Sequence, residues 1–106
     1  MFVRRIDINL KPNVMPDFKR TMEGEVLPML RKQEGFLHQM TFLRPETTQG
    51  FGLSMWKTKD AAETYNRTVY PQIMKTLERY FEGVPQVQNF EMTNSTLNLV
   101  PAVAKA

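Results

Sequence analysis

The chain has 106 residues, of which 42% are hydrophobic and 24% are charged, and these values predict one globular domain with a single core. It has no cysteine, which excludes a disulfide scaffold, a thiolate metal site and a cysteine nucleophile. Its one histidine, His38, excludes a site built from several histidine ligands. We therefore expect no metal centre and no bound metal cofactor.

The distribution of charge and hydropathy excludes two further classes of partner. The net charge is +3, but lysines and arginines are scattered among acidic residues instead of forming a patch, so we expect no nucleic-acid partner. No apolar run is long enough to cross a membrane, and the first residues lack the apolar stretch of a signal peptide. We expect a cytoplasmic protein without a membrane partner.

The first half of the chain predicts a strand followed by an irregular helix. Residues 2–10 alternate in polarity, as a strand with one apolar face does. The apolar face carries Phe2, Ile6, Ile8 and Leu10, and the other carries Val3, Arg5, Asp7 and Asn9. Residues 14–33 repeat apolar side chains every three or four positions, which predicts an amphipathic helix. Pro28 predicts a kink or break of this helix near Val26 and Leu27.

The second half predicts a hairpin, a second helical stretch and a final strand. Residues 36–44 and 51–57 are typical of two strands joined by a short turn. Helical segments follow, with Thr58 as the N-cap and an interruption at Pro71. The last elements expected are a strand over residues 86–94, a short fifth strand over 95–100 and a frayed tail over 101–106.

The order β-α-β-β-α-β predicts an α+β, ferredoxin-like fold: a four-stranded antiparallel sheet with two helices on one face. Residues 1–100 form the single domain and 101–106 its tail. The two middle strands carry large apolar side chains on both faces, and two helices cover one face only. Because soluble monomers avoid a large exposed apolar patch, we predict a homodimer packed sheet to sheet, with Leu37 and Leu43 in the interface.

Several segments resemble the antibiotic biosynthesis monooxygenase (ABM) family, and the likeness covers about residues 2–100. The segments that carry it are residues 25–36, Ser54-Met55-Trp56, residues 61–65 and Asn94-Ser95-Thr96. The resemblance implies a dimeric α+β barrel. Family members include cofactor-independent oxygenases of polycyclic aromatic compounds such as anthrones, enzymes that degrade heme, enzymes acting on quinols, and proteins without known activity.

The heme-degrading branch is the one that the residues disfavour. Its members carry an asparagine in the first strand, a tryptophan in the second helix and a histidine ten residues later. Asn9 is the candidate for the first position, but alignment on Trp56 places Tyr65 and Lys75 at the other two. Lysine is a poor axial ligand of heme iron compared with imidazole.

The candidate site residues follow from their chemistry and from the resemblance. His38 is the one neutral-pH base, and alternation places it on a face with Phe36, Met40 and Phe42. As a catalytic residue it would accept the proton of a phenol-like ligand, and Asn66 would hold a carbonyl or dioxygen. The expected pocket residues are Trp56, Tyr65, Tyr70 and Asn9. Each also has a structural interpretation. His38 could be a partly buried histidine bonded to backbone or water, and Trp56 could pack in the core under the second helix. Tyr65 and Tyr70 could be amphipathic shell residues, and Asn9 could belong to the polar face of the first strand.

Two functions of different class remain open at this point. One is an enzyme, a monooxygenase that acts on a small flat aromatic or apolar ligand without metal or flavin. The other is a non-catalytic dimeric module that binds a small molecule or a partner. A third, weaker hypothesis is heme or porphyrin binding without turnover. An enclosed apolar cavity reached by His38 and Asn66 would favour the enzyme, whereas a space filled by methionine and phenylalanine would favour the module.

Overall fold

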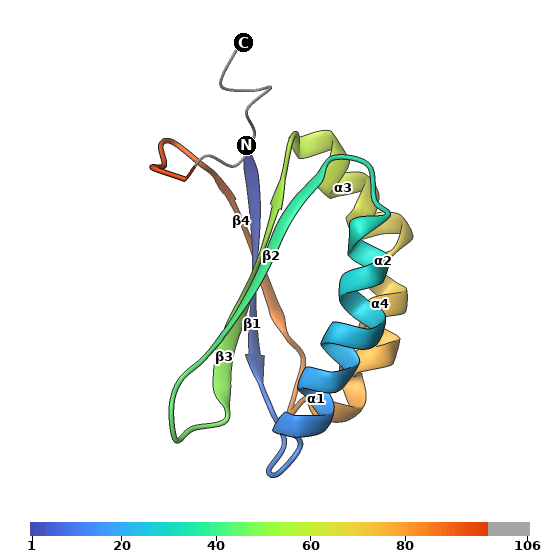
Figure 1. The fold of residues 1–106 in the computed structure, drawn as a ribbon, viewed down its shortest axis with the longest axis vertical. Helices are drawn as coiled ribbons and strands as arrows, with labels where there is room; N and C mark the ends of the chain where they lie inside the picture. The colour runs from blue at the N-terminus through green and yellow to red at the C-terminus, as the bar shows by residue number, and fades with distance from the viewer. Residues whose placement is uncertain (98–106) are drawn as a thin grey trace.

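The computed structural model describes residues 1–97 and confirms the predicted α+β fold. A four-stranded antiparallel sheet has the strand order β2-β3-β1-β4, and all helices pack on one of its faces (Figure 1). The strands are β1 (Phe2–Asn9), β2 (Phe36–Leu43), β3 (Gln49–Trp56) and β4 (Gln86–Glu91). The helical segments are α1 (Met15–Thr21), η1 (Met22–Val26), α2 (Leu27–Arg31), α3 (Lys59–Thr68), α4 (Tyr70–Leu77) and η2 (Glu78–Tyr80).

The C-terminal end differs from its expected course. β4 ends at Glu91, three residues before the predicted end of that strand, and residues 95–97 form no strand. The remainder of the expected fifth strand and the tail 101–106 lie outside the described residues. Within residues 1–97, no helix is long and apolar enough to cross a membrane.

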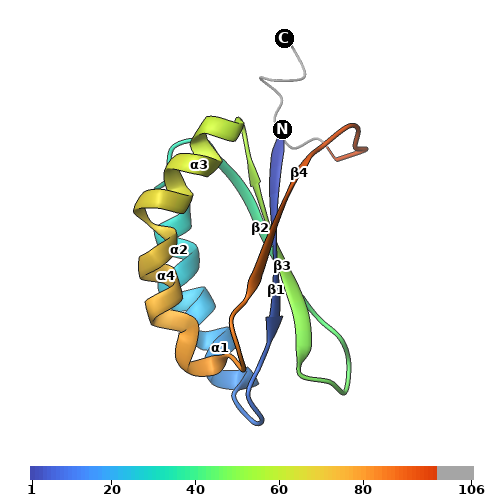
Figure 2. The ribbon, with the colours of Figure 1, turned by 180° about the vertical axis from the view of Figure 1, so that it is seen from behind.

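The first helical stretch contains the irregularity that Pro28 predicts. η1 is a π-helical segment, and the Leu27 N–H donates to the carbonyl of Met22, five residues back instead of four. Pro28 follows at the start of α2, where its ring would clash with the carbonyl four residues earlier in a regular helix. The wider π turn relieves that conflict, so α1, η1 and α2 continue as one helical column, which lies in front of α3 and α4 in Figure 1 and behind them in Figure 2.

The second helical stretch begins and breaks as expected. Thr58 caps α3, and its hydroxyl oxygen accepts a hydrogen bond of 3.1 Å from the Ala61 N–H. Pro71 lies in the first turn of α4, where its missing N–H costs no helical hydrogen bond. The two helices meet at Val69, next to Tyr70.

A β-bulge in β2 changes which side chains face the helices. Phe36 pairs with Trp56 and His38 pairs with Met55, so Leu37 is an extra residue opposite β3. Downstream of this bulge, Gln39, Thr41 and Leu43 face the helices, and the intervening residues face outward. The prediction that Phe36 shares a face with His38 is therefore wrong, as is the placement of Leu43 in the outer face.

The core lies between the sheet and the helices. Trp56 is fully buried, and Phe18, Val26, Leu30, Tyr65 and Ile73 are each at most 4% exposed. The even-numbered positions of β1 point into this core, as the alternation predicts. Burial of these side chains supplies the main driving force for folding.

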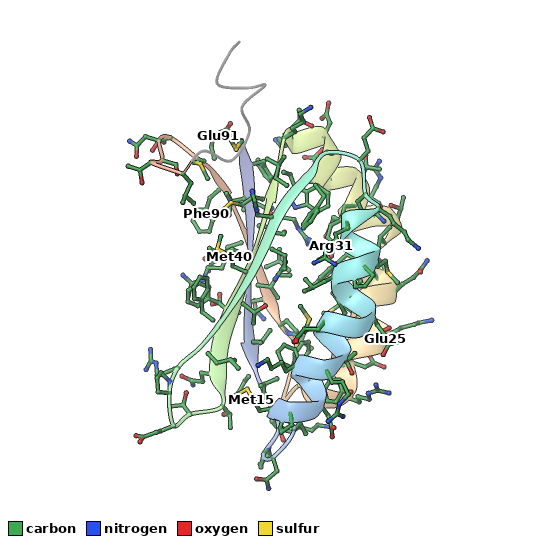
Figure 3. The ribbon with its side chains drawn as sticks, in the orientation of Figure 1. Met15, Glu25, Arg31, Met40, Phe90 and Glu91 are labelled. Carbon is green, nitrogen blue, oxygen red and sulfur yellow. The ribbon has the colours of Figure 1, made fainter. Side chains whose placement is uncertain are left out.

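The opposite, outer face of the sheet carries apolar side chains that no helix among residues 1–97 covers. Figure 3 shows Met40 and Phe90 on this side of the sheet. Register places the apolar residues of this face, hereafter the outer apolar face, at Val3, Met40, Phe42, Phe51, Leu53, Met55 and Phe90. Phe42 and Phe90 are 44% and 48% exposed, and the rings of Phe42 and Phe51 lie 5.1 Å apart. The salt bridge of 2.9 Å between Arg5 and Asp7 lies on the same face.

Candidate functional site

A small apolar cavity lies between the sheet and the helices. Its volume is about 50 Å³. β3 makes room for it, because the helix-facing positions 50 and 52 of that strand are glycines. Gly52 lines the cavity together with Ile6, Ile8, Phe18, Met22, Val26, Leu30, Gln39, Thr41, Tyr65, Tyr70, Ile73, Met74, Leu77 and Phe81. The polar groups of this wall are the hydroxyls of Thr41 and the two tyrosines and the amide of Gln39.

A larger groove runs along the free edge of β2, beneath α1 and η1. Its volume is about 450 Å³. It shares four wall residues with the cavity, namely Phe18, Met22, Gln39 and Thr41. The groove is therefore the natural approach to the cavity from solvent. The π-helical segment borders both spaces, since Met22 lines both, Val26 lines the cavity and Glu23 lines the groove.

Three aromatic residues form a stack at one end of the cavity. The rings of Trp56 and Tyr65 lie 4.7 Å apart at 33°, and those of Tyr65 and Tyr70 lie 6.1 Å apart. The Trp56 indole N–H donates a hydrogen bond of 2.9 Å to the Ser54 hydroxyl oxygen, which satisfies the one polar atom of a fully buried side chain. Trp56 and Tyr65 are both buried in the core, and of the two only Tyr65 lines the cavity.

Arg4 lies behind the two tyrosines and is 2% exposed. The guanidinium carbon lies 4.5 Å from the ring centre of Tyr70 and 5.1 Å from that of Tyr65. Its Nη2 donates a hydrogen bond of 2.7 Å to the Oδ1 atom of Asn66. Its Nη1 is buried and has no hydrogen-bond partner among residues 1–97. Within residues 1–97 no carboxylate forms an ion pair with Arg4.

Burial changes the acid–base properties of the cluster that Arg4 and Asn66 form with the aromatic stack. It raises the pKa of Tyr65 to about 12, and the nearby positive charge of Arg4 only partly opposes this effect. Burial also raises the pKa of Tyr70 and lowers the pKa of Arg4. The two phenols are therefore neutral hydrogen-bond donors at neutral pH, and the guanidinium keeps its positive charge.

The structure brings four of the predicted site residues together. Trp56, Tyr65 and Tyr70 form the aromatic stack, and Asn66 joins it through Arg4. Of these four, Tyr65 and Tyr70 line the cavity, whereas Asn66 is an exposed residue that lines a cleft on the other side of Arg4. The cluster thus has an apolar inner side and a polar outer side.

His38 and Asn9 lie away from this cluster. The bulge in β2 turns His38 to the outer face, where it is exposed beside Met40 and lines neither the cavity nor its groove. Asn9 ends β1 at the far end from Arg4, and its Oδ1 accepts a hydrogen bond of 2.7 Å from the Thr48 hydroxyl. Among the described residues, no three histidine, cysteine, aspartate or glutamate side chains are grouped as a metal site requires.

Arg4 is the functional candidate that the sequence prediction missed. The alternation of residues 2–10 contains the signal, because position 4 falls on the same face as Phe2 and Ile6. A charged residue on a buried strand face needs a partner or a function. The identity of its contacts could not be read from the sequence, since Asn66 lies 62 positions away.

Comparison with known proteins shows similarity in structure but not in sequence. No family model and no curated protein matches the chain. One similar structure is a monooxygenase from the gene ActVA-Orf6 of Streptomyces coelicolor, in complex with nanaomycin D. Its TM-score is 0.75 at 16% identity, and the alignment covers 91% of this chain and 90% of that one. SnoaB, a cofactor-independent oxygenase from Streptomyces nogalater solved as a mutant, has a TM-score of 0.74 at 9% identity, with 90% of this chain and 95% of that one covered.

A third similar structure has no assigned role. It is a protein of unknown function from Nitrosomonas europaea, with a TM-score of 0.70 at 12% identity over 93% of this chain and 95% of that one. Identities this low establish a shared fold and leave the reaction open. The α+β fold of the single chain that the sequence resemblance suggested is thus confirmed: this chain has the fold of the antibiotic biosynthesis monooxygenases.

Proposed function

We propose that this protein belongs with the ABM proteins in function as well as fold, and binds a small, flat, apolar or aromatic ligand between its sheet and its helices. The observation that carries this proposal is the apolar cavity over Gly52, closed at one end by the tyrosines and approached by the groove at the β2 edge. Apolar walls with few polar groups are typical of small-molecule sites.

Binding requires the space to open. A cavity of about 50 Å³ is too small for a three-ring ligand, because ligand sites usually measure roughly 300 Å³ or more. The adjoining groove supplies the missing volume if α1 and η1 move away from the edge of β2. The segment that would move is irregular already, since η1 interrupts the α-helical hydrogen bonding near Met22.

The catalytic form of this proposal is oxygenation without a cofactor. A ligand of the anthrone type loses a proton and becomes a carbanion that itself reduces O₂. One oxygen atom becomes the new carbonyl of the ligand, and the other leaves as water. Neutral Tyr65 and Tyr70 hydroxyls can donate hydrogen bonds to the ligand's oxygen, and Asn66 supports them through Arg4. His38 is the proposed base of this reaction. It lies on the outer face of the sheet, away from the cavity, so its role needs a test of its own.

The proposed assembly is a homodimer in which two outer apolar faces pack together. Two exposed phenylalanines on that face support it, as does the absence of any covering helix there among residues 1–97. The Arg5–Asp7 pair lies in this face and would fix the register of the two copies. The proposed location remains the cytoplasm.

A non-catalytic binding or interaction module is the second candidate function. Two observations favour it. The cavity in this structure is too small for a three-ring ligand, and His38 points away from the cavity, so no histidine base lines it. Both functions use the same fold and the same proposed dimer. They differ in whether a bound ligand is converted.

The test combines a binding titration with a turnover assay. We expect 1,8-dihydroxyanthraquinone to quench Trp56 fluorescence saturably, because the proposed ligand space adjoins the aromatic stack. Gly52→Leu should abolish the quenching by filling the cavity floor, and Val84→Leu is the matched control, because Val84 is 83% exposed and lines neither the cavity nor the groove. Equal quenching of both variants would contradict the proposed location.

Oxygen consumption separates the enzyme from the module. With 1,8-dihydroxyanthrone as substrate, the enzyme form predicts that the protein accelerates O₂ uptake and that Gly52→Leu loses this acceleration. Saturable binding with O₂ uptake at the uncatalysed rate would leave the non-catalytic module. His38→Ala then tests the base: loss of turnover with unchanged binding supports the role, and unchanged turnover removes it.

A further inference from the structure

A second opening lies at the β4 side of the sheet, opposite the groove at the β2 edge. This cleft, between α3 and β4, has a volume of about 570 Å³. Its walls are Phe2, Arg4, Lys59, Ala62, Glu63, Asn66, Val87 and Asn89. Because the sheet order is β2-β3-β1-β4, the cleft and the groove open at opposite edges. The cleft is therefore a separate space and not a branch of the proposed ligand route.

The charge of Arg4 is uncompensated at this cleft. The side chain is 2% exposed, one of its terminal nitrogens has no partner in the part of the chain that the structure describes, and the other donates to a neutral amide. The tyrosine rings offer cation–π contacts but no negative charge. Burial of a charged group without a counter-ion is costly, and proteins normally pair such a group. A guanidinium in this position is suited to receive an anion.

The neighbouring charges select the kind of anion. Lys59 and Glu63 stand at the cleft 3.8 Å apart and largely cancel each other. Arg4 then leaves a net charge of +1, which matches a monoanion, and the Glu63 carboxylate disfavours a dianion such as phosphate. Phe2, Ala62 and Val87 give the cleft an apolar wall beside the charge. A carboxylate carried on a small apolar body fits both features.

We propose that the cleft between α3 and β4 binds a small organic carboxylate, whose oxygens displace the Asn66 amide oxygen from Arg4. The exchange replaces a neutral acceptor with a charged one, and charge-assisted hydrogen bonds to a guanidinium are about twice as strong as neutral ones. A carboxylate also occupies both terminal nitrogens at once, which satisfies the unpaired Nη1. Asn66 is exposed on α3, so its side chain can swing into solvent when the anion enters.

This inference goes beyond the proposed function, because it concerns a different opening and a different ligand chemistry. The Gly52→Leu variant distinguishes carboxylate binding in the cleft from binding of the flat ligand in the cavity. That substitution should leave carboxylate binding in the cleft intact while it removes the flat ligand from the cavity. Failure of one proposal therefore does not decide the other.

The experiment is a calorimetric titration of the full chain at constant ionic strength, with benzoate as the probe and neutral benzamide as its isostere. We expect benzoate to bind at least about tenfold more tightly than benzamide, the size of effect that a hydrogen bond to a charged group confers. Inorganic phosphate should bind more weakly than benzoate. Equal affinities for benzoate and benzamide would overturn the proposal.

Three variants locate the binding. Asn66→Ala uncovers Nη2 and should strengthen benzoate binding, whereas Asn66→Asp supplies an internal carboxylate and should abolish it. These two changes lie at an exposed position, so they keep the test available if Arg4→Met fails to fold. Arg5→Met removes a neighbouring arginine on the opposite sheet face and should leave binding unchanged. Loss of benzoate binding in Arg5→Met, or its persistence in Asn66→Asp, would contradict the site.

Discussion

The Arg4 guanidinium donates a hydrogen bond of 2.7 Å to the Asn66 Oδ1 atom, and this bond joins a side chain of β1 to one of α3. The two residues are 62 positions apart in the chain. Arg4 is buried and charged, while Asn66 is exposed and neutral. The pair therefore combines a costly buried charge with a partner that compensates it only in part.

Asn66→Asp should stabilise the protein at neutral pH. The introduced carboxylate gives Arg4 a charged acceptor, and we expect a gain of about 1 kcal/mol, or a rise in Tm of roughly 4–8 °C for a domain of this size. A carboxylate beside a cation has a lowered pKa in the folded state, so the gain is present above about pH 4 and is lost as the pH falls below that value.

Thermal unfolding of the wild type and Asn66→Asp between pH 7 and pH 3 tests the predicted direction in which the stability gain changes with pH. The difference in Tm should be positive at pH 7 and should shrink on acidification. Asn66→Ala serves as the control that removes the hydrogen bond without adding charge, and its Tm should lie below that of the wild type. A difference that does not change with pH would show that Arg4 does not sense the new carboxylate.

Alkaline pH should destabilise the protein through Tyr65. Burial raises the pKa of this phenol to about 12 from an unfolded value near 10. The folded state therefore holds the proton more tightly, and its advantage is complete below pH 10 and disappears as the pH rises toward 12. The loss is at most about 3 kcal/mol, because one pKa unit corresponds to about 1.4 kcal/mol.

Urea unfolding at pH 8, 10 and 11.5 measures this loss. Tyr65→Phe removes the ionisable group and keeps the ring that stacks on Trp56, so its free energy of unfolding should fall less steeply over the same range. Parallel pH profiles of the wild type and Tyr65→Phe would show that another group causes the alkaline loss.

Charges placed on the outer apolar face should separate the proposed dimer. Phe42→Asp and Phe90→Asp put a carboxylate where two apolar sheets would meet, at positions 44% and 48% exposed in one subunit. We expect each variant to sediment as a folded monomer and the wild type as a dimer. Met15→Asp is the control, because Met15 is similarly exposed at 41% but lies on α1.

Two outcomes of sedimentation would contradict the sheet-to-sheet model. One is a wild type that is monomeric at every concentration, and the other is a dimer that survives both phenylalanine substitutions. Leu43→Asp does not test the interface, because Leu43 packs against the core and its replacement should unfold the protein. Leu43 faces the core instead of the expected interface because of the bulge in β2.

Gly24→Ala should raise the stability of the protein. Gly24 is exposed within η1, and a methyl group there meets no atom of residues 1–97 within 4 Å. Alanine lowers the backbone entropy of the unfolded chain, and the expected gain is roughly 0.5–1 kcal/mol. Chemical denaturation measures the gain. A lower free energy of unfolding would show that the π-helical segment depends on the freedom of this glycine.

Local patterns predicted most of the fold because they are set by neighbouring residues. The alternation of residues 2–10 fixed the buried face of β1, and Pro28 placed the helical irregularity at η1. The threonine cap of α3 is equally local, since the Thr58 hydroxyl bonds to an N–H three residues later. Such features need no knowledge of distant partners.

Features that depend on distant pairing escaped the prediction. The bulge at Leu37 arises from the register of β2 against β3, and one extra residue moved His38 to the outer face and Leu43 to the inner one. The contact of Arg4 with Asn66 is of the same kind. The predicted site residues Trp56, Tyr65, Tyr70 and Asn66 lie near one another in the structure, but the sequence could not show which side of the cluster each one faces.

A crystal structure of the protein with bound 1,8-dihydroxyanthraquinone would show directly whether the ligand lies between the sheet and the helices. We expect the ligand above Gly52, beside Tyr65 and Tyr70, with α1 and η1 displaced from β2. If crystals saturated with the ligand show no ligand in the cavity, or show it only on the outer apolar face, the proposed binding site is wrong.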